Sequence, residues 1–179
     1  YKNHAVLESN QHKIESNHII LCTNGFENFT ITNHYGARID HKFHDNIKGI
    51  IGYMAGYIEN RTLPSMAISY FPKKETVSGE DPYFYLTRRN HMWDEISKPL
   101  VCIGGPEEIH EELRNYSSHY PYSKTAFEDM DIFLKQTYPD STQNGINYVF
   151  KWHGIMGYTK SGIRSVGFEP ANERLLYNL

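Results

Sequence analysis

Residues 48–59 read KGIIGYMAGYIE, a run rich in β-branched and aromatic side chains that also carries three glycines. Such a composition favours a β-strand, and glycines inside a strand mark a bulge or the close approach of a ligand or another backbone. Three further strands are predicted after it, at 65–71, 82–88 and 100–103. Because these strands precede the helices rather than alternating with them, the order predicts an α+β domain with a largely antiparallel sheet.

The strand predicted at 82–88 (PYFYLTR) divides into two faces, because successive side chains of a strand point to opposite sides. One face holds Tyr83, Tyr85 and Thr87, and the other holds Phe84, Leu86 and Arg88.

Two helices are predicted after these strands, both on one side of the sheet. The Gly104-Gly105-Pro106 sequence indicates the end of the preceding strand, and proline followed by two glutamates indicates the first turn of a helix over 106–115. A second helix is predicted over 123–137, with the spacing of a capping box at Thr125 and Glu128. Its apolar stripe, which predicts packing against a sheet, consists of Phe127, Met130, Phe133 and Leu134.

Strands are also predicted on both sides of this central region. A short strand is expected at 5–8, and the apolar run 18–22 predicts a strand buried on both faces, as in a parallel sheet. The residues Thr23-Asn24-Gly25 then indicate a sharp turn. Towards the C-terminus, strands are predicted at 146–152, 163–168 and 174–179.

Composition bounds the classes of partner. The chain has 18 lysines and arginines against 21 aspartates and glutamates, so no basic stripe favours binding of nucleic acid. No apolar run approaches the ~20 residues of a membrane-spanning helix, so no membrane association is predicted. Cys22 and Cys102 are predicted to be buried free thiols, which favours a cytoplasmic setting. The closest histidine pair, His41 and His44, has no third ligand nearby, and no metal site is predicted.

Two motifs resemble those of D-amino-acid-oxidase-like flavoproteins. The run 19–25 (IILCTNG) resembles the strand and turn that lie beside the flavin domain in that family. The run 152–167 (WHGIMGYTKSGIRSVG) is similar to the family's W-x-G-x-x-x-x-T-x-x-G-x-x-x-x-G return crossing from substrate domain to flavin domain. Residues 174–179 resemble the strand before the family's C-terminal flavin contact.

The resemblance implies an internal piece of an FAD-dependent oxidoreductase that acts on an amine or amino acid. Residues 1–45 would be a remnant of the flavin-binding domain, 46–151 the substrate-binding domain and 152–179 the return crossing. The chain has no G-x-G-x-x-G fingerprint for the cofactor pyrophosphate, so FAD is expected in the full-length protein and not on this chain alone. A missing part of the parallel sheet would also leave strand edges exposed, which predicts self-association.

The resemblance also implies site residues. Those expected near the cofactor are Thr23, Asn24, Gly25 and Gly154. Those expected to line the substrate cavity are Tyr83, Tyr85, Tyr53, Met156 and Arg164. Met156 stands where many relatives place an arginine that holds a substrate carboxylate, and a thioether cannot replace that charge. Arg164, Arg88 or Arg89 would then serve, or the substrate is not a simple amino acid.

Simpler interpretations stand beside these. Tyrosines that alternate along a strand often pack or face water, and the glycines and Asn24 are also what a tight turn requires. His153 lies in the return motif, where either a proton-transfer or a structural role is compatible with its position. The alternative function is a non-enzymatic α+β module that binds a small ligand or a partner on its aromatic sheet.

Overall fold

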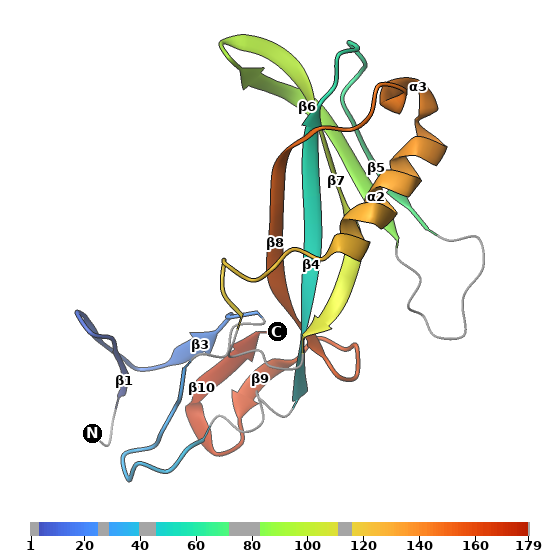
Figure 1. Cartoon of the computed structure of the whole chain (residues 1–179). Helices are drawn as coiled ribbons and strands as arrows, with labels where there is room; N and C mark the ends of the chain where they lie inside the picture. Colours follow the sequence, from blue (N-terminus) through green and yellow to red (C-terminus); the bar gives the residue numbers. More distant parts are fainter. Residues whose placement is uncertain (1–3, 25–28, 40–45, 72–82, 111–115, 179) are drawn as a thin grey trace. The chain divides into compact units, whose positions relative to one another are not determined.

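The computed structural model describes residues 4–24, 29–39, 46–71, 83–110 and 116–178 (Figure 1). The chain divides into two compact units. Unit 1 consists of Tyr1–Ile50, Ile109–Tyr116 and Ile155–Leu179, and unit 2 consists of Ile51–Glu108 and Ser117–Gly154.

Unit 2 is built around a five-stranded sheet with the order β5-β6-β7-β4-β8. Its strands are β4 (Ile47–Ile58), β5 (Met66–Tyr70), β6 (Phe84–Trp93), β7 (Ile96–His110) and β8 (Tyr148–Thr159). The first residues of β4, up to Ile50, and the last of β7 and β8, from Ile109 and Ile155 on, belong to unit 1. The β5–β6 and β6–β7 pairs are antiparallel, which confirms the predicted character of the sheet. A two-residue turn joins β6 to β7, and its Asp94 and Glu95 both have positive φ, as the tightest hairpin turns require.

The helix predicted over 106–115 is wrong for its described part, because β7 continues through Gly104-Gly105-Pro106 to His110. The glycines permit this continuation instead of ending the strand. Gly105 has a φ of +145°, and a Cβ placed on it would lie 2.0 Å from the carbonyl oxygen of Tyr83. The two backbones therefore approach more closely here than any other residue type allows. Residues 111–115 lie outside the described residues.

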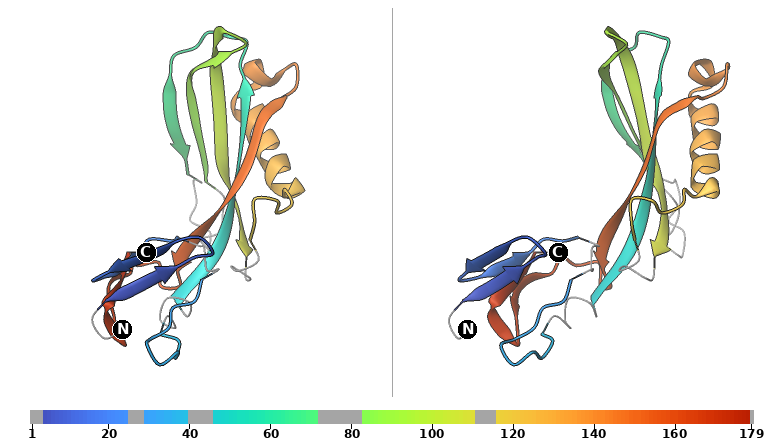
Figure 2. Two further views of the ribbon diagram at one scale, coloured as in Figure 1. Left: turned by 90° about the vertical axis from the view of Figure 1, so that its left-hand side faces the viewer. Right: turned by 60° about the vertical axis from the view of Figure 1, so that its left-hand side comes forward.

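Two helices, α2 (Lys124–Thr137) and α3 (Pro139–Thr142), lie on one face of this sheet (Figure 2). The helix predicted over 123–137 is confirmed, but its N-cap is Ser123, whose hydroxyl accepts a hydrogen bond from the Ala126 amide, and not Thr125. Met130 and Leu134 are buried against the sheet, as the apolar stripe predicts. Phe133 of α2 stacks on Phe84 of β6, with ring centroids 4.2 Å apart. Phe84 therefore marks the face of the sheet that the helix covers.

A buried ion pair lies between the sheet and α3. The Arg88 Nε of β6 donates to Glu59 Oε2 over 2.8 Å, and the two side chains are 8% and 2% exposed. The hydroxyl of Ser141, on α3, donates to the other oxygen of the same carboxylate. Both carboxylate oxygens are thus satisfied, which a buried charge requires. The contact ties β6, the end of β4 and α3 together.

Unit 1 contains a hairpin and a three-stranded sheet. The hairpin pairs β1 (Ala5–Glu8) with β2 (Lys13–Ser16), a strand that the sequence analysis missed. The sheet has the order β3-β10-β9, formed by β3 (Ile19–Leu21), β10 (Asn172–Asn178) and β9 (Val166–Glu169). β3 runs parallel to β10, with Ile20 opposite Leu176. The strand predicted at 18–22 and its place in a parallel pair are therefore confirmed.

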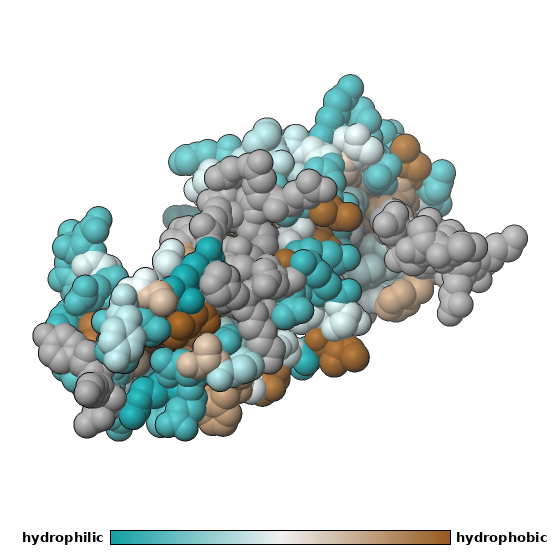
Figure 3. Space-filling model, turned by 90° about the horizontal axis from the view of Figure 1, so that it is seen from below, coloured by the Kyte–Doolittle hydropathy of each residue, from teal (hydrophilic) through white to brown (hydrophobic). Residues whose placement is uncertain are grey.

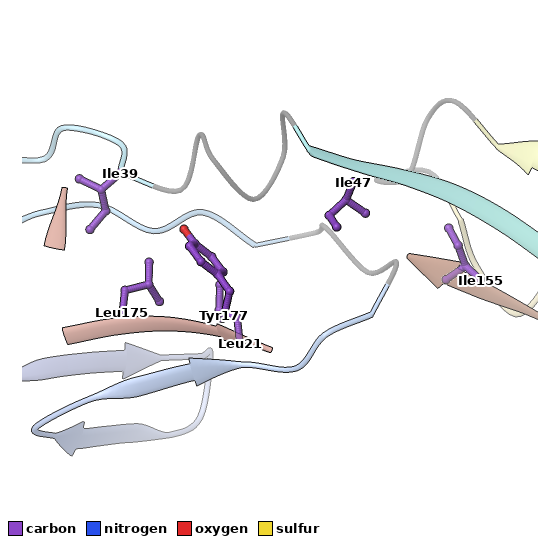
Figure 4. Close-up of a cluster of buried hydrophobic side chains, with 6 residues drawn as sticks. All are labelled: Leu21, Ile39, Ile47, Ile155, Leu175 and Tyr177. Atoms are coloured by element: carbon purple, nitrogen blue, oxygen red, sulfur yellow. The ribbon is translucent and has the colours of Figure 1, made fainter. Parts of the chain in front are cut away.

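The expectation that β3 is buried on both faces is wrong. The Ile20 side chain is 61% exposed, whereas Leu21 is buried. The reason is that the core of unit 1 lies on one side of the sheet alone. Its buried members are Leu21, Ile39, Ile47, Ile155, Leu175 and Tyr177 (Figure 4). Inside this core the Tyr177 hydroxyl donates a hydrogen bond to the buried Glu169 carboxylate.

Both cysteines are free, as predicted, but only Cys102 is buried, and Cys22 is exposed at the end of β3. Among the described residues, no helix has the length and apolar character to cross a membrane. In the view of Figure 3, the apolar side chains that reach the surface form patches separated by hydrophilic ones.

Replacing Arg88 with leucine should lower the free energy of unfolding by about 3–5 kcal/mol, because the Glu59 carboxylate would stay buried without its counter-charge. Urea unfolding followed by circular dichroism measures the change. Arg89→Leu is the matched control, since its side chain is exposed one position along the same strand, and a change within about 0.5 kcal/mol is expected. Equal destabilisation by the two variants would contradict a structural role for the pair.

Candidate functional site

The second face of the unit 2 sheet carries the predicted tyrosines. Leu86 and Arg88 are buried on the side of α2, so the alternate residues of β6 point to the opposite side. We call that side the helix-free face. Its β6 members are Tyr85, Thr87, Arg89, His91 and Trp93, and Tyr83 just before the strand joins them. The β7 residues that pair with these five β6 residues are Gly104, Cys102, Leu100, Lys98 and Ile96.

Aromatic rings gather at one end of the helix-free face. The rings of Tyr83 and Tyr85 lie 5.8 Å apart, and Phe71 stacks on Tyr83 at the same separation with an interplanar angle of 14°. Phe71 is 74% exposed and Tyr83 is 36% exposed. These rings therefore present an accessible apolar surface with hydroxyl groups, of the kind that binds flat or apolar ligands.

The Tyr85 ring lies flat against the backbone of the neighbouring strand. A Cβ placed on Gly104 would come within 2.5 Å of the phenol end of that ring, so the glycine makes room for it. Burial raises the pKa of the Tyr85 hydroxyl, and the nearby Tyr83 and Glu107 raise it further. Tyr85 consequently remains a neutral phenol at neutral pH, able to donate one hydrogen bond and to accept others.

The middle of the helix-free face is small and apolar. Thr87 pairs with Cys102, and a Cβ placed on Gly56 of β4 would lie 3.4–3.5 Å from Leu100, Cys102 and the ring of Phe150. Burial raises the pKa of the Cys102 thiol, an effect that Arg89 and a hydrogen bond with Thr87 partly offset. A buried thiol with a raised pKa is a poor nucleophile, so Cys102 is suited to packing.

Tyr53 is not on this face. Its side chain is 1% exposed and faces α2, and its hydroxyl donates to Glu108 Oε2 of β7 over 3.0 Å. Its ring lies near those of Phe127 and His153. A ring nitrogen of His153 is also 2.8 Å from the carbonyl oxygen of Tyr120, which fixes the imidazole within this packed cluster.

The candidates near the two family-like motifs lie in unit 1, apart from Gly154. Asn24 has a φ of 54°, as the predicted turn requires, and its side-chain oxygen accepts a hydrogen bond of 2.6 Å from the Gly157 amide. The two motifs, 19–25 and 152–167, are thus in direct contact. The hydroxyl oxygen of Thr23 is shielded from solvent and has no hydrogen-bond partner in the described part of the chain. Gly25 lies outside the described residues.

The remaining predicted residues are dispersed. Met156 is partly buried next to the unit 1 core, and Arg164 is exposed in the connection before β9. Gly154 is exposed, and a Cβ placed on it would meet nothing within 4 Å, so packing does not demand a glycine there. Among the described residues, no group of three or more histidine, cysteine or acidic side chains could hold a metal ion.

Comparison with solved structures finds a likeness. The chain matches the crystal structure of glycine oxidase from Geobacillus kaustophilus with a TM-score of 0.59 and 13% sequence identity. The chain therefore has a D-amino-acid-oxidase-like fold. The match covers 97% of this chain and 38% of that chain, so it spans well under half of glycine oxidase. No protein-family model matches the sequence, and no curated protein matches it.

Gly104→Ala should displace the Tyr85 ring without unfolding the sheet, because the clash falls on the far end of a side chain that can move. The pKa of Tyr85 should then fall towards the ordinary value for tyrosine, since the hydroxyl gains solvent. NMR of ring-labelled tyrosine, with the Tyr85 signal assigned from Tyr85→Phe, measures it.

Gly105→Ala is the matched comparison, because there the clash falls on the Tyr83 backbone and φ is positive. It should destabilise the fold by about 2 kcal/mol or more. An unchanged Tyr85 titration in Gly104→Ala would show that the ring does not occupy the space above the glycine.

Proposed function

We propose that this chain is the substrate-binding portion of an FAD-dependent oxidoreductase that oxidises an amine or amino acid at a CH–NH bond. The observation that carries the proposal is the likeness to glycine oxidase, which extends over 97% of the chain. The hydrogen bond between Asn24 and Gly157 supports it, because it joins the two segments that resemble the strand beside the flavin domain and the return crossing. When bound, the flavin supplies the hydride acceptor for such a reaction.

The residues that fit a cofactor contact are in unit 1. Thr23 offers a shielded hydroxyl with no partner in the described ranges, and a buried polar group in that state normally has a ligand or water to bind. The Asn24 side chain is already occupied by the Gly157 amide, so its role is to hold the turn that presents Thr23. The chain lacks the glycine-rich turn that binds a pyrophosphate, so these contacts alone do not retain FAD.

The residues that fit a substrate contact are on the helix-free face of unit 2. Tyr83 and Tyr85 would orient the substrate through ring contact and their hydroxyl groups. Hydride transfer to a flavin requires no protein nucleophile, so residues that position the substrate are sufficient. Arg88 is engaged by Glu59 in the core and is unsuited to a substrate carboxylate. Arg89 and Arg164 remain the candidates for that charge.

The alternative is a non-enzymatic module that binds a small ligand on the same face. The exposed aromatic end of the face favours binding of a ligand whether or not oxidation follows. The two proposals differ in whether the full-length protein carries a flavin.

The absorbance spectrum of the purified full-length protein tests the oxidoreductase. We expect flavin bands that bleach when an amine or amino acid is added under anaerobic conditions, and no such bands in residues 1–179 alone. A full-length protein that stays colourless after addition of FAD would leave the binding module as the function.

Thr23→Val tests the cofactor contact. In the full-length protein it should weaken FAD binding about tenfold, because a buried hydrogen bond to the cofactor is lost. Fluorescence quenching of FAD measures the dissociation constant. Without FAD, the variant should unfold at the same temperature or a higher one, since no hydrogen bond of this hydroxyl within the described residues is removed. Thr30→Val, at an exposed threonine, is the control, and equal affinities for the two variants would contradict the assignment.

A further inference from the structure

We propose that β5 is the interface of a homodimer, in which the β5 strands of two copies of this chain pair antiparallel and join their two sheets. The proposal concerns unit 2 alone and is independent of the proposed oxidoreductase function. It places the self-association expected from the sequence at the edge of the unit 2 sheet.

The outer side of β5 is open. β5 lies at the end of the strand order, with β6 on one side and no described strand on the other (Figure 2). Its three central residues, Ala67, Ile68 and Ser69, are all exposed, so neither face of the strand is covered there. Apart from the pairing with β6, no backbone hydrogen bond engages β5 within the described residues. The backbone groups on its outer side are therefore available to another strand.

The opposite edge of the sheet, β8, is protected by the chain itself. The hydroxyl of Tyr122, from the segment before α2, donates a hydrogen bond of 2.9 Å to the carbonyl oxygen of Lys151 on β8. The Tyr122 ring also lies 5.0 Å from that of His153 on the same strand. Lys151 is itself a residue that natural edge strands use to prevent pairing. In contrast, β5 (MAISY) contains no charged residue, proline or glycine.

β5 matches a second copy of itself. A two-fold axis through Ile68, the middle residue, brings all five residues of two antiparallel strands into register. Met66 then lies opposite Tyr70 of the second copy, and Ala67 lies opposite Ser69. Any other two-fold register leaves part of the strand unpaired. Because β5 is uncharged, no like charges meet across this contact, and a second copy is the occupant that the edge fits.

The two faces of the sheet agree with this pairing. Ser69 pairs with Tyr85 of β6 and therefore lies on the helix-free face, whereas Ile68 pairs with Leu86 and lies on the face of α2. The Ile68 side chain is 39% exposed in a single chain, and the two-fold axis would bring it against its own copy. On the helix-free face, the small side chains of Ala67 and Ser69 allow the two edges to approach closely.

The proposed contact is small. Five paired residues bury less surface than the about 1,200 Å² at which standard interfaces begin, and contacts of that size are transient. We therefore expect a reversible dimer whose fraction rises with the concentration of the protein.

Disulfide trapping in the full-length protein tests the contact, in a Cys22→Ser parent that lacks the exposed native thiol. Residues opposite each other in an antiparallel pair have Cα atoms about 4.5–5.5 Å apart, which a disulfide spans. Ile68→Cys should therefore form a covalent dimer on mild oxidation, seen on a non-reducing gel. Ala67→Cys and Ser69→Cys should stay monomeric like the parent, because neither residue faces its own copy. Ile96→Cys, at an equally accessible isoleucine of β7, is the control and should also stay monomeric.

Sedimentation velocity of the full-length protein without added cysteines gives a second measurement. Raising its concentration about a hundredfold should shift the sedimentation coefficient towards that of a dimer. Ile68→Lys should abolish the shift, because two like charges would meet on the two-fold axis. Ile96→Lys is the matched control and should keep the shift.

Covalent dimers that form equally at Ile68→Cys and Ile96→Cys would overturn the proposal, as would a concentration-dependent shift that persists in Ile68→Lys. Trapping at Ala67→Cys or Ser69→Cys in place of Ile68→Cys would overturn the register. A full-length protein that is monomeric at every concentration, with β5 amides protected from hydrogen exchange, would show that another segment of the same protein occupies the edge, and would overturn the homodimer.

Discussion

The ion pair between Arg88 and Glu59 fixes which side of β6 is inside. Because side chains alternate along a strand, a slip of one residue would bring Arg89 to the core and expose Leu86 and Arg88. Arg88 meets a buried carboxylate whose second oxygen is held by Ser141. Loss of either charge of such a buried pair costs far more than a surface ion pair contributes. A slip that puts Arg89 in the place of Arg88 would also carry Thr87 into the buried place of Leu86, so the ion pair and its apolar neighbour together hold the register of β6.

The same register determines which side chains lie on the helix-free face. With Arg88 inside, the residues that point outward are Tyr85, Thr87 and Arg89, and their partners on β7 are Gly104, Cys102 and Leu100. Small or buried side chains on β7 let the larger ones of β6 lie across the sheet, as the Tyr85 ring does over Gly104. The face is therefore aromatic at one end and carries Arg89, His91 and Lys98 at the other.

The sequence predicts much of this arrangement where a pattern depends on local geometry. Alternation in 82–88 correctly separates Tyr85 from Arg88, and the stripe of Met130 and Leu134 correctly identifies the buried side of α2. Prediction from the sequence fails where the contact that decides the structure joins residues far apart in the chain. Gly104-Gly105-Pro106 has the composition of a strand end, yet these residues continue β7 because β6 approaches them closely. Tyr53 has the same residue type as Tyr85, and only the position of α2 places it inside.

The parallel pairing of β3 with β10 has a consequence for the order in which the chain can fold. Ile19 lies opposite Leu175, so the unit 1 sheet requires two segments separated by almost the whole sequence. Contacts between such distant segments form slowly, because a long loop must close first. During synthesis, the strands and helices of unit 2 leave the ribosome complete before β10 exists. Until then Leu21 and Ile39 lack their partners Leu175 and Tyr177, so the N-terminal part of unit 1 exposes apolar side chains through most of synthesis, a condition that favours aggregation.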